Sequence, residues 1–382
     1  MKNNLLKNNA VQSLIASLLC IVLGLLLGYI VLLFINPAGA SEAILAVVKN
    51  FWNYSRANLQ VKNFGNTLVK TAPLLMCALS VLFAYKVGLF NIGAAGQYVI
   101  GACACLYGAL ALHWGWVACL LFAAVAGAAY AALVGLLKAY CNVNEVISGI
   151  MLNWIGLYAT NMLLSTVKES TSPYTLHLKT EAPKAILPTM GLDALFNNNT
   201  NVTIAVPLAI LFAVAILILL DKTRLGYELR ATGNNKNAAK YAGMAEKRNI
   251  ILTLAIAGAL AALGGAFLYL TDYEQWMVTS SAVPGMGFNG IAAAFLGGLN
   301  PIGTIFASYF IQHITVGGAY VDKTMYSSQI SDLISSLIIY LCGFVLFIKY
   351  AINAGIAKRE EKERVREKEQ AVPAPGEKGG EQ

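Results

Sequence analysis

Long apolar segments separated by short polar connections dominate this chain. A membrane helix needs about 20 apolar residues, and nine segments approach or exceed that length. The eighth, 285–319, is too long for one helix and contains a breaker sequence, GGLNP at 297–301. Dividing it there predicts an all-α polytopic membrane protein with about ten transmembrane elements, some of them broken or re-entrant helices. These elements are expected at 11–35, 67–85, 92–112, 114–138, 145–166, 202–220, 250–270, 285–299, 302–319 and 329–350.

Basic residues indicate which side of the membrane each connection faces. Lys and Arg are enriched in cytoplasmic loops, and here they gather near the N-terminus, in a central loop and in the tail. Six crossings before that loop and four after it place all three regions on the same side. We therefore expect cytoplasmic N- and C-termini. The expected regions are an N-terminus at 1–10, a transmembrane domain at 11–350 with a cytoplasmic loop at 221–249, and a charged, partly disordered tail at 351–382.

The overall composition supports a membrane protein and excludes several other classes. Hydrophobic residues make up 58% of the 382 positions and charged residues only 12%, against about 25% charged residues in soluble proteins. A soluble enzyme, a disordered regulator and a nucleic-acid-binding protein are thereby excluded. Membrane orientation also explains the net charge of +8, so no polyanion is needed. Anionic lipid head groups are expected at the inner face.

Motifs for catalysis, ATP binding and metal binding are absent from the sequence. It contains no GxxxxGK[ST], GxSxG or HExxH, and its Cys and His residues show no metal-ligand spacing. We expect a protein that is not an enzyme, with no catalytic residue, metal or cofactor of its own. The stretch GMGFNG at 285–290 fits GxGxxG but lacks the strand and acidic residue of a dinucleotide site. A close backbone approach at a broken helix is the favoured interpretation.

Ionisable residues avoid the middle of the predicted membrane segments. Lys86, Glu145, Asp272, Glu274 and Asp332 all lie near segment ends. Carriers coupled to protons or ions usually bury such a residue at depth. The pattern therefore argues against a secondary transporter. It favours a neutral or nearly neutral solute, with energy supplied by another subunit.

Amide side chains, in contrast, occur inside the apolar regions. An amide in hydrocarbon is costly unless it is hydrogen-bonded, and two interpretations remain open: bonds between helices, or a translocation path for a polar, uncharged solute. A short internal similarity supports the path, because LFNIGAA at 89–95 resembles GFNGIAA at 287–293. Transporters built from repeats place broken helices in corresponding positions. The candidate path residues are Asn91, Gln97, Asn153 and Asn289.

The basic loop at 221–249 contains signals for a short helix. Asn235 is a suitable N-cap for a helix that begins near Lys236. The run that follows ends at Gly243, which favours a helix stop with positive φ. A short cytoplasmic helix with small residues on one face suits docking into a groove on another protein.

Three motifs in this sequence resemble those of one family. The loop resembles the coupling-loop signature of ABC importer permeases for simple sugars, nucleosides and branched-chain amino acids. GLFNIGAAGQ at 88–97 and NEVISGIMLNWI at 144–155 resemble motifs of the same family, closest to its nucleoside (Bmp-associated) branch. One position differs, because that branch commonly has Glu where this chain has Ala95. The matching coupling residues are Gly226, Leu229, Arg230, Gly233, Asn235, Ala238, Ala239, Tyr241 and Gly243.

The resemblance implies a function and a set of partners. The chain would be the permease subunit of an ATP-driven importer in the bacterial cytoplasmic (inner) membrane, and nucleosides are the expected solutes. It implies a second permease subunit in a heterodimer, a cytoplasmic ABC ATPase with two nucleotide sites that binds the ATP, and an extracytoplasmic substrate-binding lipoprotein. Two alternatives remain: the same importer for a simple sugar, riboflavin-like compound or amino acid, or a stand-alone secondary transporter.

Overall fold

The computed structural model describes residues 9–371 except 328–332, 335, 338–339 and 342. Helices account for nearly all regular structure in this part of the chain, which otherwise contains only two isolated β-bridges. The helices are α2 (Asn9–Ile35), α3 (Ala40–Lys49), α4 (Ala57–Lys86), α5 (Ala94–Leu110), α6 (Trp116–Cys141), α7 (Glu145–Leu164), α8 (Leu178–Glu181), α9 (Leu192–Leu195), α10 (Ala205–Lys222), α11 (Arg224–Asn234), α12 (Lys236–Tyr241), α13 (Glu246–Tyr269), α14 (Met286–Leu296), α15 (Pro301–Gly317) and α17 (Val345–Ala371).

Six of the described helices are long and apolar enough to cross a membrane: α2, α4, α6, α7, α10 and α13. The predicted all-α membrane architecture is therefore confirmed. The shorter apolar helices α5 and α14, together with α15, coincide with three further predicted segments. The predicted segment 329–350 lies partly outside the described residues, as do 1–8 of the N-terminus and 372–382 of the tail.

Two helices extend well beyond their predicted boundaries. α4 begins at Ala57, ten residues before the expected start at 67, because a polar helical extension carries no apolar signal. α17 runs without a break from Val345 to Ala371, across the expected boundary at 350 between the membrane domain and the tail. Apolar patterns delimit the membrane-embedded part of a helix, whereas the hydrogen-bonded helix continues beyond it.

α4 and α13 form the centre of the helix bundle. In the most apolar stretch of each helix, 89% of the residues are buried in α4 and 72% in α13. The corresponding share is 22–28% in α2, α6, α7 and α10. α13 packs against α4, α5 and α6. Its contact with α6 depends on small residues, because a Cβ added at Gly127 would lie 2.6 Å from the carbonyl oxygen of Gly258. The surrounding helices direct apolar side chains outward, as expected for contact with lipid.

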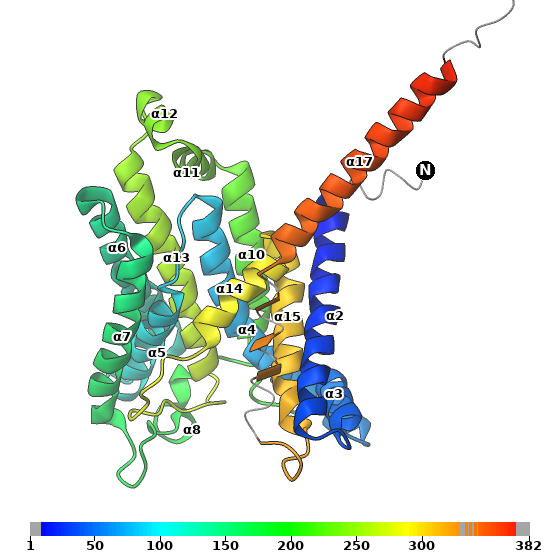
Figure 1. The fold of residues 1–382 in the computed structure, drawn as a ribbon. Coiled ribbons are helices and arrows are strands. Elements are labelled where there is room, and N and C mark those ends of the chain that lie inside the picture. The colour runs from blue at the N-terminus through cyan, green and yellow to red at the C-terminus, as the bar shows by residue number, and fades with distance from the viewer. Residues whose placement is uncertain (1–8, 328–332, 335, 338–339, 342, 372–382) are drawn as a thin grey trace, which may run out of the picture.

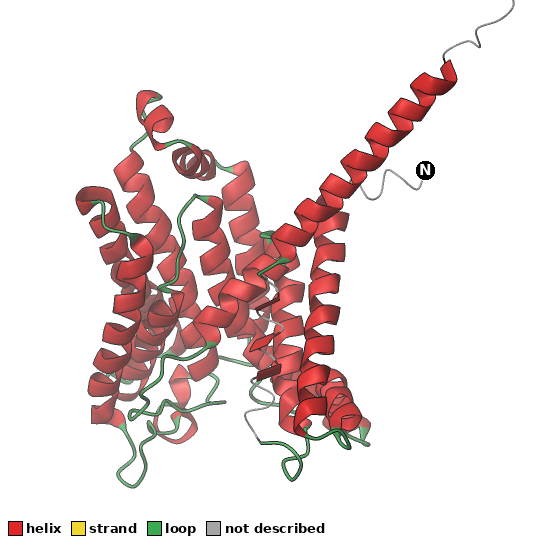
Figure 2. Cartoon of the chain, in the orientation of Figure 1, coloured by secondary structure: helices red, strands yellow, loops and turns green. Residues whose placement is uncertain are grey.

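The polar connections are segregated to the two ends of the bundle (Figure 1). α11, α12, the start of α2 and the far end of α17 lie at one end, whereas α3 and α8 lie at the other. The basic loop therefore lies at the same end of the bundle as the start of α2 and the far end of α17, which are the first and last helix ends that the structure describes. A non-helical segment, residues 87–93, joins α4 to α5 and enters the bundle between helices (Figure 2).

Candidate functional site

A buried pair of amides lies where the non-helical segment 87–93 meets the first turn of α5. The Asn91 Nδ2 group donates to Gln97 Oε1 over 2.8 Å, and Gln97 Nε2 donates back to Asn91 Oδ1 over 3.0 Å. Asn91 also donates to Ser80 Oγ of α4 over 2.9 Å. All three side chains are buried. The amides therefore satisfy one another and tie the 87–93 segment to two helices.

Asn153 fastens α7 to the same segment. Its Oδ1 atom accepts a hydrogen bond from the Gly96 backbone N–H over 2.7 Å, and its Nδ2 group donates to the Ile92 carbonyl over 3.1 Å. A Cβ at Gly96 would lie 2.7 Å from the Asn153 Cα atom, so glycine is required for this approach. Together with Asn91 and Gln97, Asn153 forms one polar cluster around the start of α5.

Asn289 lies apart from this cluster. It is half-buried in the first turn of α14, and its side chain makes no hydrogen bond to any described residue. The two similar segments nevertheless touch, since a Cβ at Gly287 would lie 2.8 Å from the Ala95 Cβ atom. α5 and α14 therefore begin beside each other inside the bundle. Of the four path candidates, Asn289 alone carries an amide with no bonds to other described residues.

A cavity of about 400 Å³ adjoins the polar cluster. Its wall is formed by α7, the start of α14 and the loop before α14. The loop is held in place by Asn161 of α7, which donates to the Ser280 carbonyl over 2.8 Å and accepts from Trp276 Nε1 over 2.9 Å. The lining residues are Ile92, Ile150, Asn153, Trp154, Ala282, Val283 and Phe288.

An ionised carboxylate also fastens this loop, on the side away from α11 and α12. Glu169 accepts hydrogen bonds from Ser172 Oγ over 2.7 Å and from Gln275 Nε2 over 3.1 Å. These donors favour the charged form and lower the pKa of the Glu169 carboxyl. Gln275 also donates to the Thr175 carbonyl, so the 167–200 connection and the loop before α14 are joined.

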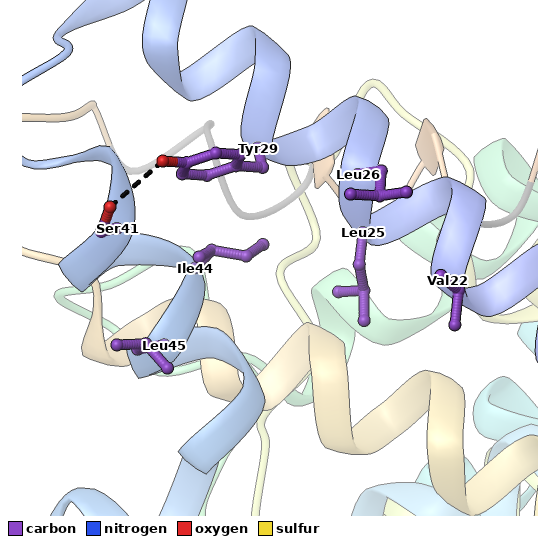
Figure 3. A pocket seen from close by; sticks show the side chains of 7 residues that line it. All are labelled: Val22, Leu25, Leu26, Tyr29, Ser41, Ile44 and Leu45. Carbon is purple, nitrogen blue, oxygen red and sulfur yellow. Dashed lines mark hydrogen bonds between the residues drawn. The ribbon is translucent and has the colours of Figure 1, made fainter.

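A second hollow, between α2 and α3, has a different chemistry (Figure 3). It measures about 340 Å³ and is lined mainly by aliphatic side chains. Its two hydroxyl groups, on Tyr29 and Ser41, bond to each other over 3.2 Å. This lining suits a lipid chain better than a polar solute. The residues are Val22, Leu25, Leu26, Tyr29, Ser41, Ile44 and Leu45.

The basic loop forms two helices, α11 and α12. Thr223 caps α11 by accepting a hydrogen bond from the Gly226 backbone N–H over 3.0 Å. Asn235 caps α12 by accepting from the Ala238 N–H over 3.0 Å, and Gly243 follows α12 with φ +77. The predicted cap, short helix and positive φ are thus confirmed. The helix α11 was not predicted, although Thr223 is a suitable cap.

The predicted coupling residues divide between the interior and the surface. Gly226 and Leu229 are buried against the bundle, and Ala239 is only 4% exposed. Tyr241 is 94% exposed, and Ala238 also faces solvent. Asn235 and Gly243 are exposed as well, whereas Arg230 is half-buried and pairs with Asp221 over 3.3 Å. Ala239 therefore anchors α12, while Ala238 and Tyr241 are available to another molecule.

The end of α11 touches the start of the 87–93 segment. Gly88 has φ +76, and a Cβ there would lie 2.8 Å from the Gly233 carbonyl oxygen and 2.9 Å from its Cα atom. A Cβ at Gly233 would in turn collide with the Val87 carbonyl. Asn249 of α13 holds this end of α11 through a 2.9 Å bond to Thr232 Oγ1. One backbone contact thus connects the basic loop to the segment that carries Asn91.

Comparison with known proteins identifies the family of this chain. Residues 63–343 match the family described as the permease component of branched-chain amino acid transport systems. The chain belongs to this permease family. It is a multi-pass membrane protein of the cytoplasmic membrane and the transport subunit of an ABC transporter, rather than an enzyme. No solved structure matches it.

Curated relatives align over most of the chain. The nucleoside ABC transporter permease protein NupB of Lactococcus lactis is 32% identical over 92% of this chain and 95% of its own length. The guanosine ABC transporter permease protein NupP of Bacillus subtilis is 30% identical over 89% and 96%, respectively. The glucose ABC transporter permease protein TsgB13 of Haloferax volcanii is 30% identical over 78% and 80%.

Proposed function

We propose that this permease imports nucleosides. The observation that carries the proposal is the near full-length similarity to two permeases named for nucleoside and guanosine transport. The sequence supports an uncharged solute, because its ionisable residues lie near the ends of the apolar segments. The glucose permease relative covers less of the chain, so a sugar is the second candidate.

Uptake of labelled solutes by a strain that lacks the permease tests the substrate. Expression of the chain with its partner subunits is expected to restore guanosine uptake, and excess unlabelled nucleoside should compete. Glucose, riboflavin and branched-chain amino acids serve as matched competitors. Restoration of glucose uptake without nucleoside uptake would reject the proposal in favour of the second candidate.

The proposed topology has ten membrane elements with both termini in the cytoplasm. Support comes from the common location of α11, α12, the start of α2 and the end of α17 (Figure 1), together with the basic residues of these regions. A cysteine at the exposed position Tyr241 provides the test. In a strain that lacks the ATPase, an impermeant thiol reagent is expected to label it in inside-out vesicles and not in intact cells.

The proposed energy source is a separate ABC ATPase that docks on α12. The exposed Ala238 and Tyr241 would contact its groove, while Gly226, Leu229 and Ala239 hold α11 and α12 on the bundle. ATP binding would move these helices, and the contact between Gly233 and Gly88 would pass the motion to the polar cluster. A second permease subunit and an extracytoplasmic substrate-binding lipoprotein complete the proposed importer.

The proposed solute path runs beside the start of α5. Asn91, Gln97 and Asn153 would shape its wall by holding the 87–93 segment in place, since their amides bond within the protein. Asn289, whose amide makes no bond to the described residues, would contact the solute. The path thereby offers amide groups rather than charges.

A further inference from the structure

The cavity beside Asn153 differs from the α2–α3 hollow because two aromatic side chains line it, whereas Tyr29 is the one aromatic residue that lines the hollow. Trp154 of α7 is 44% exposed and Phe288 of α14 is 39% exposed, and both line the cavity from different helices. None of its described lining residues carries a charge. Such a lining is suited to a flat, uncharged, aromatic group.

The indole of Trp154 continues an aromatic surface along α7. Its ring centroid lies 6.3 Å from that of Tyr158, with an angle of 25° between the ring planes. The two residues are one helical turn apart, so their rings follow the same face of α7. The exposed rings thus form a stacking surface that leads to the cavity.

Asn153 is only 2% exposed but borders the cavity, where its amide can add a polar contact. Its amide uses one acceptor position for the Gly96 N–H and one N–H for the Ile92 carbonyl. A primary amide has a second N–H and a second acceptor position. The edge of a nucleobase presents the complementary donors and acceptors.

We propose that this cavity binds the base of the transported nucleoside, with Trp154 and Phe288 supplying stacking surfaces and Asn153 contacting the edge of the base. The inference rests on the proposed function and specifies where the permease distinguishes a nucleoside from a simple sugar. A volume of about 400 Å³ falls in the range of small-molecule sites, about 300–1,000 Å³. Stacking tolerates different bases, because every base has a π-face.

Photolabelling of the assembled transporter with 8-azidoguanosine tests the location directly. After irradiation and proteolysis, mass spectrometry is expected to find the label on the α7 peptide that contains Trp154 or on the α14 peptide that contains Phe288. Excess guanosine should prevent labelling, whereas excess ribose should not. Labelling confined to other peptides, in a transporter that imports guanosine, would overturn the inference.

Substitution of Trp154 separates stacking from simple apolar packing. Trp154→Leu keeps an apolar side chain but removes the ring, and it is expected to lower both photolabelling and guanosine uptake about tenfold. Trp154→Phe should restore most of both. Trp114→Leu is the matched control, since Trp114 is 41% exposed and lies outside the cavity lining.

The outcomes also distinguish this inference from its alternatives. Normal labelling and uptake in Trp154→Leu would refute the stacking role. If Trp154→Leu instead prevents co-purification of the other subunits, and Trp154→Phe does the same, the ring packs against a subunit and the inference fails. If the wild-type transporter imports no nucleoside, the proposed function itself fails.

Discussion

Gly88→Ala tests whether the contact between α11 and the 87–93 segment transmits coupling. Gly88 has φ +76, and its added Cβ would lie 2.8 Å from the Gly233 carbonyl oxygen and 2.9 Å from the Gly233 Cα atom. Both obstructing atoms belong to the backbone, so no side-chain rotation can relieve the collision. The two segments must separate for the variant to fold.

The size of the effect follows from two contributions. An alanine in the left-handed region costs about 1–2 kcal/mol, and overpacking typically adds about 1–3 kcal/mol. Because folded domains are stable by about 5–15 kcal/mol, the variant is expected to fold and reach the membrane. The collision with Gly233 should displace the end of α11 from the segment that carries Asn91.

Gly191→Ala is the matched control. Gly191 has φ +85, but nothing lies within 4 Å of an added Cβ, so its substitution carries the conformational cost without a collision. In proteoliposomes, Gly88→Ala is expected to lose at least about tenfold of the ATPase stimulation by the loaded binding protein, the equivalent of about 1.4 kcal/mol. Gly191→Ala should retain stimulation. Nucleotide hydrolysis without the binding protein should persist in both.

The reciprocal substitution checks the interpretation. Gly233→Ala would collide with the Val87 carbonyl across the same contact, so it should produce the same defect. The double variant should be little worse than either single variant, because substitutions at one contact are not additive. Wild-type stimulation in Gly88→Ala, at equal membrane abundance, would refute transmission through this contact.

Four further outcomes are expected. Asn153→Ala should lower the melting temperature and uptake, since an unsatisfied buried group costs about 1–3 kcal/mol; unchanged values would contradict its bracing role. Gly243→Val should retain membrane abundance but lose coupled uptake, because valine disfavours φ +77. Tyr241→Cys should crosslink to the ATPase and the buried Ala239→Cys should not, whereas the reverse would reject the docking surface. The pKa of Glu169 is lowered in the folded state. The carboxylate should therefore stabilise the folded protein above the unfolded-state pKa, and this stabilisation should disappear as the pH falls through the folded-state pKa. Glu169→Gln should flatten this acid dependence of thermal stability.

Local signals predicted the features whose causes lie within a few residues. Apolar runs predicted the membrane helices, because burial in hydrocarbon requires continuous apolar sequence. The α12 cap at Asn235 and the positive φ of Gly243 also follow from short-range chemistry. α11 was missed because its sequence is polar on average and lies in a basic loop, although its Thr223 cap and the helical spacing of Leu225 and Leu229 were visible.

The role of the amides could not be predicted in this way. Sequence identifies polar groups in an apolar setting, but their hydrogen-bond partners are distant in the chain, as with Asn153 and Gly96, which are 57 positions apart. The hydrogen-bond partners decide which donors and acceptors of an amide are used within the protein and which remain for a solute. Asn91, Gln97 and Asn153 bond within the protein, Asn153 through one donor and one acceptor, whereas the amide of Asn289 makes no bond to the described residues.

Ala95 connects this packing to the chemistry of the solute. The branch that this sequence resembles commonly has Glu at this position, whereas Ala95 is fully buried and lies against Gly287 at the start of α14. A Glu carboxyl at this buried position would be desolvated, which is costly unless the group is paired. The close approach of α5 and α14 itself requires glycine at position 287, because a Cβ there would collide with the Ala95 backbone. The same approach brings Phe288 and Asn153 to one cavity whose described lining is free of charge, so the helix packing and the proposed path for an uncharged solute have a common structural origin.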